Sequence, residues 1–484
     1  MWQGIQHITN YKNNNSTTVD GDASLAEELN CFFARFEVNA VETDTTTSPA
    51  SNNHTLTVQE HDVRRVLRAV NQRKAAGPDG VTGRVLKECA DQLTEIFTKI
   101  FNLSLQIHHP FVPEICHNHP SEPIFSLIDY RPVALTPLIM KCFKRLVLQH
   151  IKTILPPTFD PNQFAYRANR STEDAIATVL HSALSHLEHQ GSYVRMLFID
   201  YSSAFNTVIP GRLVSKLSDL GFSPNICQWI KDFLTNHPQT VRIGPHFSST
   251  LTLSTGSPQG YVLSPMFYSL YTYDCAPTHP TNTIVKFADD TTVVGLITRG
   301  DESAYRDEIQ RLAVWCSDNN LVLNSIKTKE LIIDFRKNSR TPDPLYINSN
   351  CVERVPAFRF LGTHIAEDLS WSINTTTSVK KAQQRLHFLR ILRKNNLEEK
   401  LMVSFYRCSI ESVLAYCLTT WCASCSEKDR KALRRVINTA QKVIGCSLPS
   451  LEELFSQRCL NRAGKNNCRL FAPWTLPVCS SALR

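Results

Sequence analysis

The stretch Ile284-Val285-Lys286-Phe287-Ala288-Asp289-Asp290-Thr291-Thr292-Val293-Val294 places two adjacent aspartates inside an apolar, β-branched run. The pattern predicts a strand, a tight turn and a second strand. Two interpretations of the turn remain open from this stretch alone. In the first interpretation the stretch is an ordinary hairpin turn, because aspartate is a common turn residue. Alternatively, it is half of a divalent-metal site, since two neighbouring carboxylates are best tolerated beside cations.

The composition is that of a folded protein with a mild excess of positive charge. Of the 484 residues, 42% are hydrophobic and 20% are charged, which excludes a disordered chain. Lysine and arginine outnumber aspartate and glutamate 52 to 44, for a net charge of +8. Such a charge permits a nucleic-acid partner without requiring one. The length suffices for about two to four domains.

No pattern in the sequence directs the chain out of the cell or into a membrane. The N-terminus lacks a signal-peptide pattern, and we expect no run of about 18 apolar residues that could span a bilayer. The 16 cysteines are scattered, and the pair Cys422 and Cys425 has no second pair at zinc-site spacing. We therefore expect an intracellular, reduced protein that is neither secreted nor bound to a membrane.

Polar and irregular stretches alternate with helical and strand patterns. Residues 1–55 are polar and are expected to form a linker. The His- and Pro-rich stretch 108–123 indicates an irregular loop in preference to a zinc site, because it shows little periodicity. From about residue 374 the pattern is almost purely helical and strongly basic. A basic helical face is either simply solvated or binds a nucleic-acid backbone.

A third aspartate strengthens the case for metal binding. Asp200 ends the apolar strand 196–199, just as Asp289 and Asp290 follow the strand 285–288. Two such strands side by side would bring three carboxylates into one small volume, where divalent cations relieve their repulsion. Two Mg²⁺ ions about 3.5–4 Å apart can hold the attacking and leaving oxygens of a phosphoryl transfer. The third aspartate thus favours a metal site.

Seven short motifs, which include the stretches with the three aspartates, follow one another along the chain. They are RKAAGPDG at 73–80, YRPVAL at 130–135, FIDYSSAF at 198–205, GSPQG at 256–260, FADD at 287–290, LNSIKT at 323–328 and FLG at 360–362. In this order the motifs resemble those of the reverse transcriptase of a non-LTR (LINE-type) retrotransposon. The resemblance runs from about Trp2 to Arg462.

The resemblance implies an α+β fold, the right-hand polymerase, in which an antiparallel-sheet palm lies between fingers and a helical thumb. The reverse transcriptase domain as a whole would span about 110–366. The expected parts are a polar linker left from the connector after a missing endonuclease, the fingers, the palm, a basic helical thumb and an irregular tail, at 1–55, 56–190, 191–366, 367–463 and 464–484 respectively.

The same resemblance implies a catalytic centre with two Mg²⁺ ions, for which Mn²⁺ could substitute. Asp200 and Asp289 would bind both ions, with Asp290 assisting. Lys327 would give a proton to the pyrophosphate leaving group and neutralise part of its charge. Each role is what the family's motifs imply at these positions.

Further residues would hold the nucleotide and the nucleic acids. Arg131 would meet the triphosphate of the incoming dNTP, and Phe205 would exclude a 2′-hydroxyl as a steric gate. Gln259 and Gly260 would contact the incoming nucleotide and the template. The primer grip would be Phe360, Leu361 and Gly362, and the template–primer backbone would contact Lys380, Lys381, Arg385, Arg390, Arg393 and Lys394.

The chain also departs from the family pattern. Between about 106 and 128 it is too short and wrongly composed, so we expect one hairpin of the fingers to be missing or damaged. Tyr261 stands where a smaller residue is usual. We expect RNA-directed DNA synthesis from an RNA template, a DNA primer and dNTPs in the nucleus, with an endonuclease acting in trans. The alternative is a decayed retrotransposon product that binds nucleic acid without polymerising.

Overall fold

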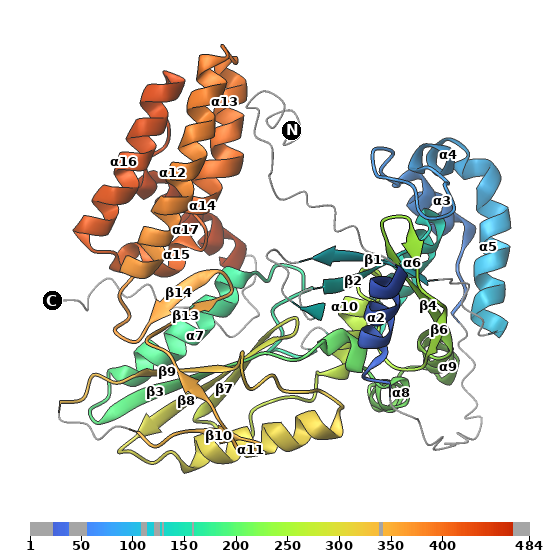
Figure 1. Cartoon of the computed structure of the whole chain (residues 1–484), viewed down its shortest axis with the longest axis horizontal. Coiled ribbons are helices and arrows are strands. Elements are labelled where there is room, and N and C mark those ends of the chain that lie inside the picture. The colour runs from blue at the N-terminus through green and yellow to red at the C-terminus, as the bar shows by residue number, and fades with distance from the viewer. Residues whose placement is uncertain are drawn as a thin grey trace.

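The computed structural model describes residues 23–37, 56–107, 114–120, 126–127, 130–156, 159–337 and 342–467. At its centre lies a five-stranded sheet that corresponds to the expected palm (Figure 1). Neighbouring strands of this sheet are antiparallel, except that β12 and β9 are parallel. In spatial order the strands are β12 (Glu353–Arg354), β9 (Lys329–Ile333), β3 (Ser192–Ile199), β8 (Asp290–Thr298) and β7 (Asn282–Phe287). The expectation that the strands 196–199 and 285–288 are neighbours is therefore wrong, because β8 lies between β3 and β7. The strand next to β3 is β8, which begins at Asp290.

Strand β3 is buried along its whole length because helices cover both faces of the sheet. Successive side chains of a strand point to opposite faces. Accordingly, Leu197 and Ile199 belong to one hydrophobic core, whereas Met196 and Phe198 belong to a second core on the other face. This burial explains why the strand is a nearly continuous apolar run rather than an alternating one.

A second sheet joins segments that are far apart in the sequence. β1 pairs antiparallel with β2 and parallel with β4. The expectation of an irregular loop is therefore wrong for β1, and the rest of 108–123 lies outside the described residues. The expectation that one hairpin of the fingers is missing or damaged stays a prediction. The strands are β1 (Glu114–Pro120), β2 (Tyr130–Leu135), β4 (His237–Ile243), β5 (His246–Phe247) and β6 (Leu251–Leu253).

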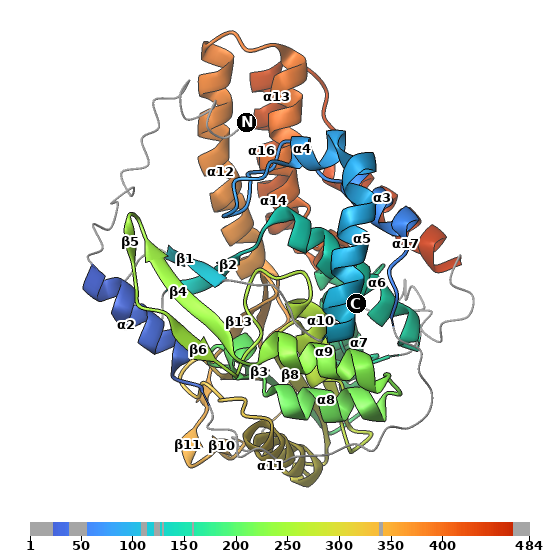
Figure 2. The ribbon, with the colours of Figure 1, turned by 90° about the vertical axis from the view of Figure 1, so that its right-hand side faces the viewer.

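Helix α2 (Ala23–Ala34) packs against β4, β5 and β6 (Figure 2). Its buried face contains Leu29 and Phe33, and Asn30 is also buried. The Asn30 amide donates a hydrogen bond of 2.9 Å to the carbonyl of Ser249 and accepts one of 2.9 Å from Gln239. The expectation of a polar linker is therefore wrong for this helix, although the rest of 1–55 lies almost wholly outside the described residues.

Helices surround both sheets. α7, which falls in the range expected for the fingers, packs against β3 and β7 of the palm sheet instead. The helical stretch 83–107 is divided at Cys89 into α4 and α5. The helices are α3 (Glu60–Arg68), α4 (Gly83–Glu88), α5 (Ala90–Ile107), α6 (Leu138–Ile154), α7 (Thr172–Leu187), η2 (Ala204–Thr207), α8 (Pro210–Asp219), α9 (Pro224–Leu234), α10 (Ser264–Tyr271) and α11 (Ser303–Asp318).

The C-terminal part is a bundle of helices that stands above the hairpin of β13 (Ala357–Phe360) and β14 (Thr363–Ala366) (Figure 1). A smaller hairpin pairs β10 (Tyr346–Ile347) with β11 (Asn350–Cys351). The helices of the bundle are α12 (Ser372–Lys394), α13 (Glu399–Tyr406), η3 (Arg407–Glu411), α14 (Ser412–Leu414), α15 (Leu418–Trp421), η4 (Cys422–Ser424), α16 (Glu427–Ile444) and α17 (Leu451–Asn467). Because α17 continues to Asn467, the tail expected from 464 begins as helix; 468–484 lie outside the described residues.

One helical stretch of the bundle, Glu399–Ser424, is long and apolar enough to cross a membrane by length and composition. This differs from the expectation that no such run exists. Its most apolar window is 44% buried, and Met402, Phe405 and Tyr406 lie in the core of the bundle. A core helix has the same properties, so the stretch is weak evidence for a membrane span.

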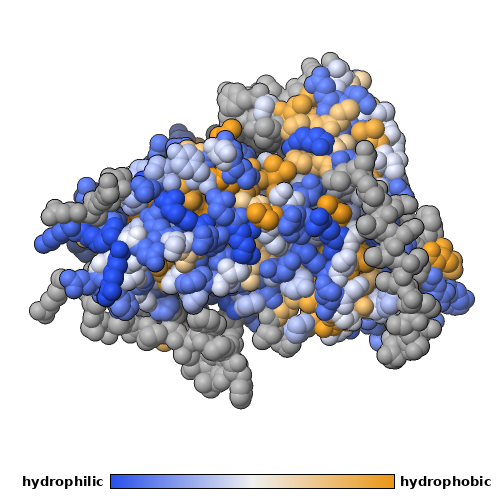
Figure 3. Space-filling model, turned by 90° about the horizontal axis from the view of Figure 1, so that it is seen from below, coloured by the Kyte–Doolittle hydropathy of each residue, from blue (hydrophilic) through white to orange (hydrophobic). Residues whose placement is uncertain are grey.

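The face of the molecule opposite the bundle, seen from below, is mostly hydrophilic on its left and centre (Figure 3). Apolar residues gather in smaller patches, chiefly toward the upper right of that view. Scattered apolar residues on a surface are normal for a folded protein, so this face does not by itself indicate a binding surface.

Candidate active site

The turn between β7 and β8 consists of Ala288 and Asp289, because Phe287 pairs with Asp290. Ala288 has φ of +59°, a left-handed conformation that costs an L-residue roughly 1–2 kcal/mol. The strand-turn-strand prediction is thus confirmed. The conformation of Ala288 needs support from its surroundings, since a strained residue persists only where neighbouring structure holds it.

Asp200 lies directly opposite this turn. In the register of β3 and β8, Ile199 pairs with Thr291. Because the strands are antiparallel, Asp200 is one residue beyond that pair and faces Asp290. The register therefore brings the carboxylates of the two motifs to the same edge of the sheet, as the sequence predicts.

The backbone of Asp200 is held on both sides by the stretch 324–328. The N–H of Asp200 donates to Oγ1 of Thr328 at 3.4 Å, and the carbonyl of Asp200 accepts from the N–H of Asn324 at 2.9 Å. Asn324 in turn accepts, through Oδ1, a hydrogen bond of 3.2 Å from the N–H of Lys327. These contacts explain how the lysine motif is placed beside the first aspartate.

One cavity of about 100 Å³ unites several of the predicted residues. Asp200, Asp290, Lys327, Phe360 and Leu361 all line it. Two of the three predicted metal ligands, the predicted proton donor and two of the three predicted primer-grip residues therefore meet in one place. Arg359 also lines the cavity, and the sequence analysis missed it; its position beside the FLG motif is the signal that could have found it.

Asp289 is half-buried and does not line this cavity. Its charge acts on two neighbouring tyrosines: burial raises the pKa of Tyr268 and of Tyr166, and the Asp289 carboxylate adds to both shifts. Asp289 thus lies on the side of the turn toward these rings. Of the three predicted aspartates, the structure brings two into the shared cavity and leaves the third beside it.

The donor set fits a hard divalent cation. Two carboxylates share the cavity and a third lies next to it, and carboxylate oxygens are the side-chain ligands that Mg²⁺ prefers. Among the residues that the structure describes, no three His, Cys, Asp or Glu side chains form a ready-made metal cluster. The predicted metal ligands are therefore near one another without being closed into a coordination sphere.

The hairpin of β13 and β14, which carries the predicted primer grip, is held between the palm and the thumb. The ring of Phe358 stacks on Phe198 of β3, with centroids 4.0 Å apart. At the tip, Leu361 accepts a hydrogen bond of 2.8 Å from the hydroxyl of Tyr416. A Cβ on Gly362, whose φ is +88°, would approach the Tyr416 ring to 3.1 Å. The positive φ favours glycine there, and any larger residue would also require the Tyr416 ring to shift.

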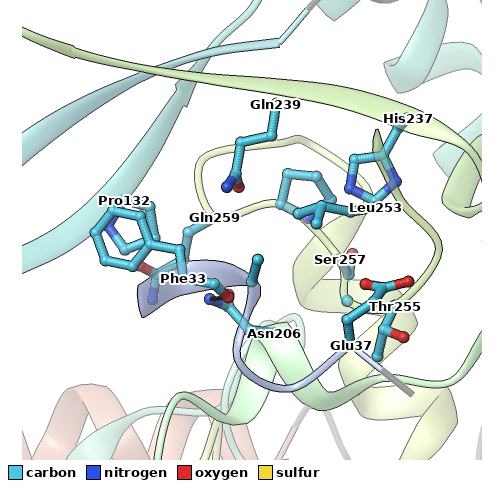
Figure 4. Close-up of a pocket in the computed structure, with 13 residues that line it drawn as sticks. Phe33, Glu37, Pro132, Asn206, His237, Gln239, Leu253, Thr255, Ser257 and Gln259 are labelled. Atoms are coloured by element: carbon cyan, nitrogen blue, oxygen red, sulfur yellow. Dashed lines mark hydrogen bonds between the residues drawn. The ribbon is translucent and has the colours of Figure 1, made fainter. Parts of the chain in front are cut away.

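The GSPQG loop is hydrogen-bonded to both β2 and η2 and lines a second cavity (Figure 4). Gln259 accepts, through its carbonyl, a hydrogen bond of 2.8 Å from the N–H of Ala134 in β2. Gly260 has φ of +98°, and a Cβ there would come within 3.2 Å of the Ala134 carbonyl. Close approach of the loop to β2 therefore explains this glycine. Gln259 lines the second cavity, and its contact with the nucleotide and the template stays a prediction.

Side chains from the second sheet, from η2 and from α2 also line the cavity of Gln259. Phe33 and Glu37 come from α2 and the residues after it, and His237 comes from β4. The sequence analysis missed the contribution of α2. The signal was present in the helical spacing of Ala26, Leu29 and Phe33, which a polar flanking sequence obscured.

Phe205 lies in η2, and its ring packs against Tyr268 with centroids 4.9 Å apart. Only 8% of the residue is exposed. Its carbonyl accepts a hydrogen bond of 2.8 Å from the N–H of Ser257, which ties the first palm motif to the GSPQG loop. Its role as a steric gate stays a prediction.

The remaining predicted contacts are less closely gathered. The backbone of Arg131 pairs with His119 in the β1–β2 ladder, whereas its side chain lies outside the described part of the chain. Arg385 donates a hydrogen bond to the carbonyl of Ser409 within the thumb. The other basic residues predicted on α12 are exposed, namely Lys380, Lys381, Arg390, Arg393 and Lys394.

Comparison with known proteins identifies relatives of the chain. It is 24% identical over 401 residues to the probable RNA-directed DNA polymerase from transposon X-element of Drosophila melanogaster, covering 80% of this chain and 44% of that protein. It is 26% identical over 383 residues to the RNA-directed DNA polymerase from mobile element jockey of the same organism, covering 74% and 40%. The chain thus spans less than half the length of these curated relatives.

Two further matches do not bear on the family of this chain. A solved structure of telomerase from Candida albicans with a telomeric RNA fragment has a TM-score of 0.39 and 11% identity, covering 76% of this chain and 68% of that one. Residues 371–412 match a model described as the N-terminal part of alkylated DNA repair protein alkB homolog 8.

The match that decides the family covers residues 120–365, just over half of the chain, and is described as reverse transcriptase (RNA-dependent DNA polymerase). These residues include the palm sheet, the three aspartates, the GSPQG loop and the FLG motif. The chain therefore belongs to the reverse transcriptase family, and its α+β fold is the expected right-hand polymerase.

Proposed function

We propose that this chain is an RNA-directed DNA polymerase that extends a DNA primer on an RNA template by two-metal phosphoryl transfer. The observation that carries the proposal is the shared cavity, in which Asp200 and Asp290 meet Lys327 and the primer-grip residues Phe360 and Leu361. Nucleotidyl transfer needs carboxylates that can hold divalent metal ions and positive charge near the leaving group. Asp200 and Asp290 supply the carboxylates, and the Lys327 ammonium supplies positive charge.

In this reaction the primer 3′-hydroxyl attacks the α-phosphate of a dNTP, and pyrophosphate leaves. Asp200, Asp289 and Asp290 would hold two Mg²⁺ ions, or Mn²⁺, which neutralise charge and align the reacting oxygens when bound. Lys327, exposed at the rim, would give a proton to the leaving pyrophosphate. Because the primer is DNA, we propose that the protein acts in the nucleus.

The substrate-binding roles extend outward from this centre. Phe205 and the GSPQG loop are tied together through the Ser257 N–H, so the residues proposed to contact the sugar and base of the nucleotide form one unit. The hairpin of Phe360 to Gly362 would hold the primer end. The exposed lysines and arginines of α12 would contact the phosphate backbone.

Primer extension on an RNA template with Mg²⁺ tests the proposal, with Asp289→Ala as the matched control. We expect the wild type to add dNTPs and the variant to lose extension while binding the same template–primer. Equal incorporation by both proteins, or none by either, contradicts the proposal.

A second candidate is a protein that binds template–primer without extending it. The observation in its favour is that Asp289 stands outside the cavity shared by Asp200 and Asp290. This candidate would be established if the wild type and Asp289→Ala bound the template–primer with equal affinity and the wild type extended no primer with Mg²⁺ or Mn²⁺.

A further inference from the structure

The segment from Asp160 to Ala165 lies along β7 and reaches the catalytic turn. The N–H of Lys286 donates to the carbonyl of Asn162 at 2.8 Å, and the N–H of Phe164 donates to the carbonyl of Lys286 at 2.8 Å. These two bonds form a short parallel bridge on the edge of the palm sheet. The segment therefore lies next to the last residues before the turn.

Within this segment, one side chain satisfies both backbone groups of Ala288. Oε1 of Gln163 accepts from the N–H of Ala288 at 2.9 Å, and Nε2 of Gln163 donates to the carbonyl of Ala288 at 3.3 Å. The same Oε1 accepts from the N–H of Ala165 at 3.0 Å, which fixes the amide in place. Gln163 is only 1% exposed, so water does not compete for these bonds.

A buried ion pair anchors the segment one step deeper. Nζ of Lys286 lies 3.0 Å from a carboxylate oxygen of Asp160, and the two side chains are 2% and 1% exposed. The same Nζ donates to the carbonyl of Thr272 at 2.7 Å. Because Lys286 is two residues before Ala288, the ion pair and the Gln163 amide hold the same end of β7.

We propose that Gln163 is a positioning residue: by fixing the left-handed Ala288, its amide sets where the neighbouring Asp289 carboxylate stands relative to Asp200. This inference rests on the proposed polymerase function. Ala288 occupies a conformation that its own side chain disfavours. Loss of the amide would free the turn to relax, and a displacement of about 1 Å at a catalytic group lowers rates about 10²-fold.

The variant Gln163→Met tests this role, because methionine is similar in length and cannot make either bond. Asn282→Ala is the matched control: Asn282 is a buried amide at the opposite end of β7, where it donates to the carbonyl of Ala304 at 2.9 Å. Both variants lose buried hydrogen bonds and should lose stability. Only Gln163→Met should alter the turn.

Three readouts separate positioning from a merely structural role. For Gln163→Met we expect faster hydrogen exchange of the Ala288 amide and weaker Mn²⁺ binding by the protein in its complex with template–primer. We also expect a kcat about 10²-fold lower, with the KM for dNTP changed less than about threefold. For Asn282→Ala we expect none of these changes at a similar Tm. Identical exchange, Mn²⁺ affinity and kcat in the two variants would overturn the inference.

Gln163→Glu supplies a second test that also covers poor folding of the first variant. The new carboxylate can accept from the Ala288 N–H but can donate to the Ala288 carbonyl only when protonated. Its rate relative to wild type should therefore rise as pH falls from about 8 to about 6; a constant ratio contradicts the inference. Wild type that fails to extend any primer refutes the proposed function, whereas wild type that extends beside an unaffected Gln163→Met refutes only this inference.

Discussion

At the scale of single residues, the three aspartates show which features of the site can be predicted from the sequence. The pattern of two apolar strands, each followed by acids, predicts the proximity of Asp200 and Asp290, because strand register follows from a buried sheet. The pattern does not predict that Asp289 lies outside the cavity that Asp200 and Asp290 line. The direction of a side chain in a two-residue turn depends on the turn's dihedral angles, and no rule for the sequence would place Ala288 in a left-handed conformation.

His237 provides a pH-dependent prediction. It is 8% exposed, and burial lowers its pKa from 6.5 to about 4. The folded protein therefore keeps the ring neutral, while the unfolded chain takes up a proton below pH 6.5. Stability from this group is present above pH 6.5 and is lost as pH falls toward 4, by roughly 2 kcal/mol between pH 7 and pH 5.

The measurement is urea unfolding of wild type and His237→Asn at both pH values. Asparagine can keep the hydrogen bond that Nδ1 makes to the carbonyl of Leu234 at 3.0 Å, and it does not titrate. The variant should therefore lose less stability than wild type on acidification. Parallel losses in the two proteins would show that His237 does not titrate as described.

At the scale of elements, the long periodic helices and the palm strands follow from sequence pattern, and the failures have physical causes. α2 was hidden because its buried face includes the polar Asn30, which periodicity counts as surface. β1 was hidden because a strand rich in His and Pro, EICHNHP, has low intrinsic strand propensity. Its pairing with β2 and β4 overrides that propensity.

Asn30 tests the importance of α2. Its side chain is 0% exposed and bonds to both Gln239 and Ser249. Replacing Asn30 with Ala removes both bonds and takes this acceptor from the buried Gln239 amide, which should cost about 1–3 kcal/mol in free energy of unfolding. Glu28→Ala, on the exposed face of the same helix, should change it by less than about 0.5 kcal/mol. Equal effects in denaturant unfolding would show that α2 does not pack as described.

At the scale of the whole molecule, the parts are less separable than the sequence suggests. The second sheet pairs Ile115 and Cys116 with Thr240 and Val241, so it joins the expected fingers to the expected palm. Such contacts between distant segments have no local signal in the sequence, which is why the expected domain limits remain predictions. The thumb is the part whose helical character the sequence predicts best, because its apolar and basic residues recur at helical spacing.

The thumb's charge gives a prediction for binding as a whole. Lys380, Lys381 and Arg390 are exposed on α12, so replacing all three with Gln should weaken template–primer binding. The slope of log K against log salt should fall by about 0.7–0.9 for each phosphate that the protein no longer neutralises. The control is Lys87→Gln with Lys99→Gln on α4 and α5, at the far end of the molecule (Figure 1). An unchanged slope in the α12 variant would exclude this surface from backbone binding.

The most direct test of the account is whether Asp200 and Asp289 act as one metal-dependent unit. The measurement is the single-turnover rate of dNTP addition to a DNA primer on RNA, for Asp200→Asn, Asp289→Asn and the double variant. Residues that act together are strongly non-additive, so each single variant should lose about 10³-fold or more and the double variant should lose little further. Single variants near the wild-type rate, or losses that multiply in the double variant, would contradict the account.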